Sequence, residues 1–176
     1  IQCLVLKHTP KKFETYEDEI QYLIGNERRN KFISKLSIDL KGNTLILYSR
    51  VESHGRILYD MINNFVTSDR KVFFIHGGVD AEDREKVREI TEQENNAIIV
   101  ASYGTFSTGI NIRRLHNVIF ASPSKSRVRN LQSIGRVLRK GKDKVKAKLY
   151  DIADDLTSGA SCLLYTSDAA DEGHCV

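Results

Sequence analysis

The sequence lacks the patterns that hold small proteins together through disulfides or metal ions. It has three cysteines, an odd number, and no C-x-x-C pair, so neither a disulfide framework nor a zinc site is encoded. The five histidines show no ligand spacing either, and we expect most of them at the surface or in loops. These absences predict no metal site and a reducing, intracellular compartment.

Long apolar runs are also missing. No run approaches the roughly 18 residues needed to span a bilayer, and the chain does not begin with a charged segment followed by an apolar one. The sequence therefore predicts a cytoplasmic protein, and its 176 residues suit one domain with a buried core. The chain begins at Ile1 and its only methionine is Met61, so we expect its natural start to lie upstream.

Two catalytic signatures are absent as well. A Walker A loop needs G-x-x-x-x-G-K-[ST], but the Gly-Lys pair at 141–142 has Arg136 in place of the first glycine and Asp143 in place of the hydroxyl. An α/β-hydrolase needs a G-x-S-x-G elbow, and none exists. The sequence therefore predicts neither a self-contained P-loop NTPase nor a serine hydrolase.

Charge is unevenly distributed along the chain. From Arg113 to Lys148 there are twelve basic residues and one acidic residue, which predicts a polyanionic partner, although the run from Lys140 onward also fits a solvated turn. Residues 157–176, in contrast, contain no Lys or Arg and three acids. This tail differs in character from the rest, and we read it as disordered or non-native sequence.

Hydrophobic patterning predicts an α/β fold. Residues 15–40 carry apolar side chains at helical intervals, with a break at Gly25-Asn26. The later apolar runs are continuous instead of alternating, which indicates parallel strands buried on both faces and covered by helices. We expect strands at 1–7, 44–48, 71–75, 97–101, 117–121 and 147–152. We expect helices at 53–65, at 81–93 with Asp80 as its cap, and at 128–139.

Two segments have the chemistry of phosphate binding. Arg136 and Arg139 are three apart on one predicted helix, so they share a face and offer planar donors to phosphate oxygens. The same spacing also fits an exposed basic helix with an apolar core-facing side. Upstream, residues 102–111 form a predicted loop rich in Gly, Ser and Thr, which suits phosphate contacts and also suits an ordinary turn.

Together these segments resemble the second RecA-like lobe of superfamily 2 helicases. Residues 132–139 match that family's motif VI, Q-x-x-G-R-x-x-R, and residues 107–111 resemble motif V, with Asn111 where an aspartate is more usual. Residues 45–50 resemble motif IV and residues 72–78 resemble motif IVa, in the family's order. The residues of motifs V and VI most resemble those of helicases from T4-like phages that remodel branched DNA.

The resemblance implies a RecA-like, P-loop NTPase-type parallel sheet flanked by helices. We expect this helicase C-terminal domain to cover residues 1–156, with 1–42 as a lead-in strand and helices and 43–156 carrying motifs IV to VI. Residues 157–176 would lie outside it. If the chain is phage-encoded, the expected compartment is the host cytoplasm.

The resemblance also implies roles for individual residues. Arg136 and Arg139 would contact the γ-phosphate of ATP, Gln132 would orient their helix, and Gly109 and Asn111 would approach the nucleotide. Mg²⁺ would be held mainly by a first lobe, whose Walker A and B motifs we expect to be absent here, so the isolated chain is predicted to be inactive as an ATPase.

A second set of residues would hold a nucleic-acid backbone through hydroxyls, amides and charge. The set consists of Ser49, Arg50, His76, Gly77, Ser102 and Thr105. Each also fits a turn or a cap at the end of a strand. The implied partners are DNA, single-stranded or branched, with RNA as a further possibility, and the N-terminal lobe of the same polypeptide. The alternatives are a nucleic-acid-binding module without ATPase activity and a flavodoxin-like phosphate binder.

Overall fold

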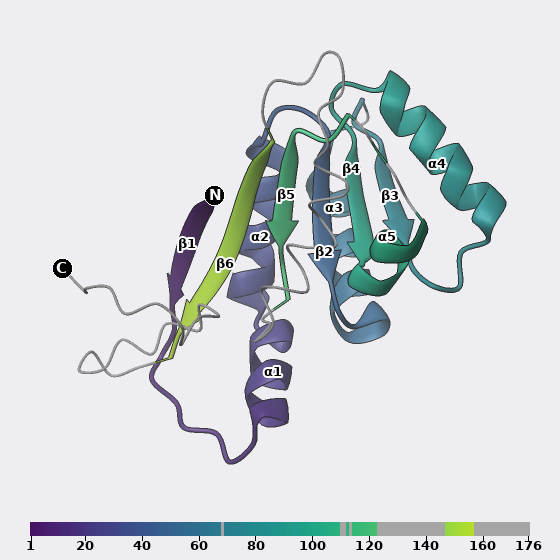
Figure 1. Cartoon of the computed structure of the whole chain (residues 1–176). Coiled ribbons are helices and arrows are strands. Elements are labelled where there is room, and N and C mark those ends of the chain that lie inside the picture. Colours follow the sequence, from purple (N-terminus) through teal and green to yellow (C-terminus); the bar gives the residue numbers. More distant parts are fainter. Residues whose placement is uncertain (68, 110–111, 113, 123–146, 157–176) are drawn as a thin grey trace.

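Six parallel strands form a single sheet in the computed structural model, which describes residues 1–67, 69–109, 112, 114–122 and 147–156. Figure 1 shows the strands side by side with all their arrowheads at one edge of the sheet. Their order across the sheet is β1-β6-β5-β2-β4-β3. The strands are β1 (Gln2–Lys7), β2 (Thr44–Tyr48), β3 (Val72–Ile75), β4 (Ile98–Ser102), β5 (Asn117–Phe120) and β6 (Lys148–Asp155).

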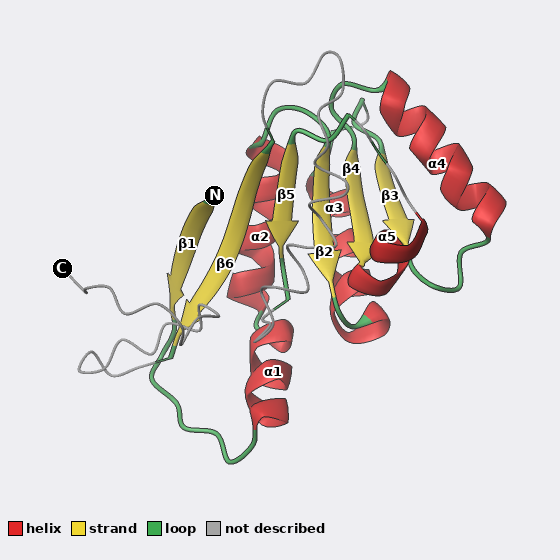
Figure 2. Cartoon of the chain, viewed as in Figure 1, coloured by secondary structure: helices red, strands yellow, loops and turns green. Residues whose placement is uncertain are grey.

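Helices cover both faces of this sheet (Figure 2). On one face, α2 (Glu27–Asp39) and α3 (Ile57–Phe65) bury Ile33, Leu58 and Ile62 against the strands. On the other face, α4 (Ala81–Gln93) and α5 (Tyr103–Gly109) contribute to a second apolar cluster, which includes Phe106. The predicted α/β architecture with helices on both sides is therefore confirmed.

The central strands are buried along almost their whole length, as their continuous apolar runs predict. Every residue of β2 and β5 is buried, and so is all of β4 except Ser102. The edge strand β1 alternates between exposed and partly buried residues because only β6 pairs with it. Burial of these strands on both faces makes a large apolar contribution to the stability of the domain.

Side-chain caps fix the first two helices. α1 (Tyr16–Gly25) begins after Thr15, whose hydroxyl accepts a hydrogen bond from the Asp18 N–H at 3.1 Å. Asn26 ends α1 and caps α2, because its side-chain oxygen accepts from the Arg29 N–H at 3.0 Å. The predicted break at Gly25-Asn26 is confirmed. Asp80 does stand at the cap position of α4, but its side chain makes no cap hydrogen bond, so that part of the prediction is wrong.

Two further local predictions need correction. The segment predicted as one helix from 53 to 65 begins instead as a π-helical turn, η1 (Val51–Arg56), which continues into α3. The Gly55 N–H bonds to the Arg50 carbonyl oxygen five residues back, at 2.9 Å. The segment after β4 is the short helix α5 and not a loop. The helix predicted at 128–139 lies outside the described residues.

None of the helices in the described ranges combines the length and apolar character that crossing a bilayer requires.

Candidate nucleic-acid interface

The carboxyl ends of β2, β4 and β3 lie next to one another at one edge of the sheet, because these strands are parallel neighbours. The connection after β2 runs through η1 and α3 on one face, whereas the connection after β4 runs through α5 on the other. In open α/β sheets, ligands bind in the crevice outside the carboxyl ends of two strands whose connections diverge in this way. All six residues predicted to hold a nucleic-acid backbone belong to the segments that leave this edge.

Ser49 and Arg50 follow directly after β2. The Ser49 N–H donates to the Ser122 hydroxyl at 2.9 Å, so this amide has an intramolecular partner. Arg50 precedes η1, and its Nη2 lies 2.6 Å from each carboxylate oxygen of Glu17 on α1. The Arg50 side chain is 38% exposed and that of Glu17 is 56% exposed, so the pair lies at the surface.

Ser102 and Thr105 contact each other at the carboxyl end of β4. The Ser102 hydroxyl donates to Thr105 Oγ1 at 2.7 Å and accepts from the Thr105 N–H at 3.3 Å. Thr105 is buried, and Ser102 is partly buried. These contacts are those of a side chain that caps the first turn of α5. The hydroxyl of Thr105 is therefore directed into the fold.

His76 and Gly77 follow β3. The imidazole of His76 accepts from the Gly78 N–H at 3.1 Å through Nδ1 and packs against Phe74, with ring centroids 5.1 Å apart. A side-chain carbon added at Gly77 would meet no atom within 4 Å, so this backbone is open to approach. The guanidinium of Arg56 also packs on Phe74, 4.5 Å from the centroid of its ring.

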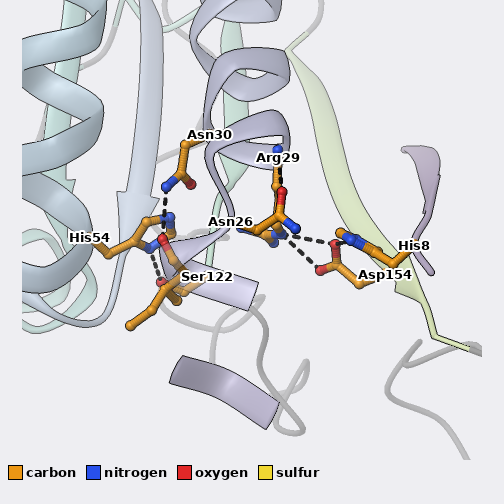
Figure 3. A network of polar contacts seen from close by, with 8 residues as sticks. His8, Asn26, Arg29, Asn30, His54, Ser122 and Asp154 are labelled. Atoms are coloured by element: carbon orange, nitrogen blue, oxygen red, sulfur yellow. Dashed lines mark hydrogen bonds and ion pairs between the residues drawn. The ribbon is translucent and has the colours of Figure 1, made fainter. Parts of the chain in front are cut away.

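A buried imidazole links the end of β2 to the end of β5 (Figure 3). His54 Nδ1 lies 3.1 Å from the Ser122 hydroxyl, which also accepts the Ser49 N–H. Burial lowers the pKa of His54 to about 3, and the nearby positive charge of Arg29 acts in the same direction. His54 is completely buried, so it is an exception to the expectation that most histidines lie at the surface or in loops.

A buried ion pair lies beside this link, at the carboxyl ends of β1 and β6 (Figure 3). Arg29 Nε donates to both carboxylate oxygens of Asp154, at 2.9 and 3.0 Å, and the His8 imidazole bonds to the same carboxylate at 2.8 Å. Burial raises the pKa of Asp154, but the hydrogen bond from His8 and the interactions with Arg29 outweigh burial, so the pKa lies below its usual value. The carboxylate therefore stays charged and ties β1 and α2 to β6.

The residues predicted to meet ATP fall mainly outside the described part of the chain. Gly109 is the last residue of α5, whereas Asn111, Gln132, Arg136 and Arg139 lie outside the described residues. Within the described ranges, no three or more His, Cys, Asp or Glu side chains are grouped so as to hold a metal ion.

The sequence does contain one D-E-x-H quartet, at residues 171–174. Its letters fit the Walker B pattern, which corrects the expectation that this pattern is absent. The acids of a Walker B motif directly follow a buried strand, whereas residues 166–170 separate these acids from the short apolar run at 162–165.

Sequence reasoning missed the buried polar residues of this edge. His54, Ser122 and Asp154 stand alone among residues of no recognisable motif, and their partners are 68 to 146 positions away in the chain. The one available signal is the position of Ser122 and Asp154 at the ends of apolar runs, where parallel strands place side chains at the functional edge.

Comparison with known proteins identifies the fold and the family. The model of the helicase conserved C-terminal domain matches residues 27–141. The ATP-dependent DNA helicase UvsW of Enterobacteria phage T4 is 42% identical over 149 residues, which is 83% of this chain and 29% of UvsW. A putative ATP-dependent RNA helicase of Acanthamoeba polyphaga mimivirus is 31% identical over 131 residues, covering 73% of this chain and 23% of that protein. The chain thus spans less than a third of the length of either relative.

Solved structures agree with this comparison. The crystal structure of T4 UvsW superposes with a TM-score of 0.74 at 36% identity, covering 94% of this chain and 35% of that chain. The Escherichia coli DEAD-box protein SrmB superposes with a TM-score of 0.58 at 16% identity, over 73% of this chain and 71% of that chain, which shows the fold alone. The resemblance based on motifs IV to VI is confirmed, and this chain belongs to the helicase conserved C-terminal domain family, as a RecA-like second lobe of superfamily 2.

Proposed function

We propose that this chain is the second motor lobe of an ATP-dependent helicase or translocase that remodels branched DNA. Family membership and similarity to a phage DNA helicase support this function. The observation that carries the proposal is the position of three predicted contact segments, after β2, β3 and β4, at one edge of the sheet. RNA is a further candidate partner, because a relative is named as an RNA helicase.

Nucleic acid would lie across this edge and contact it mainly through its backbone. Open backbone at Gly77, the imidazole of His76 and the guanidinium of Arg56 are grouped around β3. Amides, an imidazole and a guanidinium bind phosphates and sugars without distinguishing bases. We therefore expect binding that depends on charge and not on sequence.

ATP, with Mg²⁺, would bind between this lobe and a first lobe that holds the metal. In this proposal Arg136 and Arg139 contact the γ-phosphate, Gln132 orients their helix, and Gly109 and Asn111 approach the nucleotide. An arginine placed in this way in other NTPases raises the rate of hydrolysis by a factor of about 10³ to 10⁵. Closure on ATP and opening after hydrolysis would alternately tighten and release the strand. Residues 1–156 would form the lobe, and residues 157–176 would take no part.

The nucleic-acid interface is tested by removing one cation near each end of β3. Arg56→Ala removes a guanidinium near the carboxyl end, whereas Lys71→Ala removes an ammonium just before the amino end, where it pairs with Glu94. Fluorescence anisotropy with labelled single strands of two unrelated sequences, over a salt series, measures the effect. Each phosphate contact contributes about −0.7 to the slope of log K against log salt on single strands.

We expect Arg56→Ala to weaken binding to both sequences alike and to flatten the slope by about 0.7. Lys71→Ala should leave the slope unchanged. Equal effects of the two variants, or a strong preference of the wild-type chain for one sequence, would contradict an interface at the carboxyl ends of these strands.

A further inference from the structure

Arg50 is the one arginine among the six nucleic-acid contacts predicted from the sequence, and in the structure its guanidinium is already bound to an anion. Its Nη2 lies 2.6 Å from both carboxylate oxygens of Glu17. Arg50 belongs to the segment after β2, whereas Glu17 lies in the first turn of α1, 33 positions earlier in the chain. A carboxylate therefore occupies the position on Arg50 that a phosphate of a nucleic acid would take.

Glu17 is held in place for this contact. Gln21, one helical turn later, donates from Nε2 to Glu17 Oε1 at 2.9 Å. The hydrogen bonds from Gln21 and then from Arg50 lower the pKa of Glu17. The side chain is thus fully charged at neutral pH and is directed at Arg50 by its own helix.

The pair is also open to exchange with a solvent-borne anion. Both side chains are more than a third exposed, at 38% for Arg50 and 56% for Glu17. Exposed pairs of this kind contribute little to folding. Carboxylates and phosphates compete for the same guanidinium donors, so a phosphate can replace Glu17 without disturbing buried structure.

We propose that Glu17 is a competing anion that lowers the affinity of this lobe for nucleic acid until a phosphate displaces it from Arg50. The proposal rests on the proposed nucleic-acid interface and assigns α1 a part in it. In the free protein Glu17 shields Arg50 from other anions, and in the complex the freed carboxylate faces the bound strand. The lobe therefore binds nucleic acid more weakly, and releases it more easily, than it would if Arg50 had no carboxylate beside it.

The experiment compares two variants that remove the same charge from the same helix. Glu17→Gln removes the carboxylate that binds Arg50. Glu19→Gln is the control, because Glu19 belongs to the same first turn, and no side-chain hydrogen bond or ion pair is seen for it in the described ranges. Anisotropy with a labelled thymidine oligonucleotide at low salt gives the dissociation constants. Circular dichroism confirms that both variants fold.

We expect Glu17→Gln to bind about two- to fivefold more tightly than Glu19→Gln, which corresponds to the strength of an exposed ion pair. The gain should vanish in an Arg50→Ala background, because the competition needs the guanidinium. Equal affinities of the two glutamine variants would overturn the proposal.

The Arg50→Ala single variant separates this failure from failure of the interface itself. If Arg50→Ala weakens binding while the two glutamine variants are equal, Arg50 is a contact and only the competition is wrong. If Arg50→Ala has no effect, both the competition and the part of Arg50 in the interface are wrong. The comparison of Arg56→Ala with Lys71→Ala then decides whether nucleic acid binds at this edge of the sheet at all.

Discussion

At the scale of single residues, His54 connects two segments at the carboxyl edge of the sheet. It is fully buried, and its Nδ1 lies 3.1 Å from the Ser122 hydroxyl, to which the Ser49 N–H also donates. One imidazole thus joins the segment after β2 to Ser122, two residues beyond β5. Because burial and the charge of Arg29 outweigh the opposite effect of Asp154, only the neutral form of this ring suits the site.

The lowered pKa of His54 makes stability depend on pH in a defined direction. The folded pKa is about 3, and an unfolded histidine titrates near 6.5. Between these values only the unfolded chain binds the proton, so the contribution is fully present above about pH 6.5 and is lost as the pH falls toward the folded value. The loss approaches about 1.4 kcal/mol per pH unit.

We therefore expect the free energy of unfolding, measured with urea from pH 7 to pH 5, to fall steeply in the wild-type chain. The fall should be shallower in His54→Gln, which has no titrating ring. Asp154 adds little here, because its carboxylate, with a lowered pKa, loses its contribution only at lower pH. Parallel curves for the two proteins would show that His54 is not held neutral.

At the scale of elements, the connection after β2 is unusual, because its first turn, η1, packs very closely against β2. Gly55 lies in the π-helical turn, and a side-chain carbon built on it would come within 2.5 Å of two ring atoms of Tyr48. The Tyr48 ring is fully buried, and its hydroxyl donates to the Ile75 carbonyl oxygen at 3.0 Å. The ring has no room to move, so this position requires glycine.

We expect Gly55→Ala to destabilise the domain by about 1 to 3 kcal/mol, the usual cost of overpacking a core. Gly25→Ala is the matched control, because an added carbon there meets no atom within 4 Å. It should leave stability unchanged or raise it slightly, since alanine favours helix over glycine. Thermal unfolding of both variants measures the difference, and equal melting temperatures would show that the turn can move away from Tyr48.

Elements that depend on local pattern were predictable, and those that depend on distant contacts were not. The strand at 44–48 and the helix at 81–93 match prediction at both ends, because continuous apolar runs and helical spacing are local signals. α5 was missed because Gly104 and its Ser, Thr and Gly neighbours have weak helix propensity, which the burial of Phe106 overrides. No sequence period distinguishes the π-helical turn, which packs closely against the Tyr48 ring.

The candidate site was predictable only in part for the same reason. Motif order placed the contact segments after β2, β3 and β4, which parallel topology then groups at one edge. The pairing of Arg50 with Glu17 and of Arg29 with Asp154 joins residues 33 and 125 positions apart. Such pairs depend on the packing of whole helices, and a single sequence carries no sign of them.

At the scale of the whole molecule, the sheet order decides where the proposed interface lies. Strands β2 and β4 are neighbours in the sheet, and their connections leave on opposite faces, so the proposed interface lies at their carboxyl ends. The sequence has no Walker A loop, and the chain spans less than a third of each relative. We therefore propose that this lobe depends on a second one for nucleotide chemistry.

Hydrolysis of ATP tests that dependence most directly, in a phosphate-release assay on this chain alone and on the protein that also contains the first lobe. We expect no appreciable turnover from the chain alone. The two-lobe protein should hydrolyse ATP when DNA is present and lose at least about a hundredfold in kcat on Arg136→Ala or Arg139→Ala, because each removes charge stabilisation from the transition state. Lysine should restore little, since it lacks the planar donors. Turnover near 1 per second from the chain alone, within the ordinary enzyme range, or undiminished DNA-stimulated hydrolysis in both alanine variants, would contradict the account.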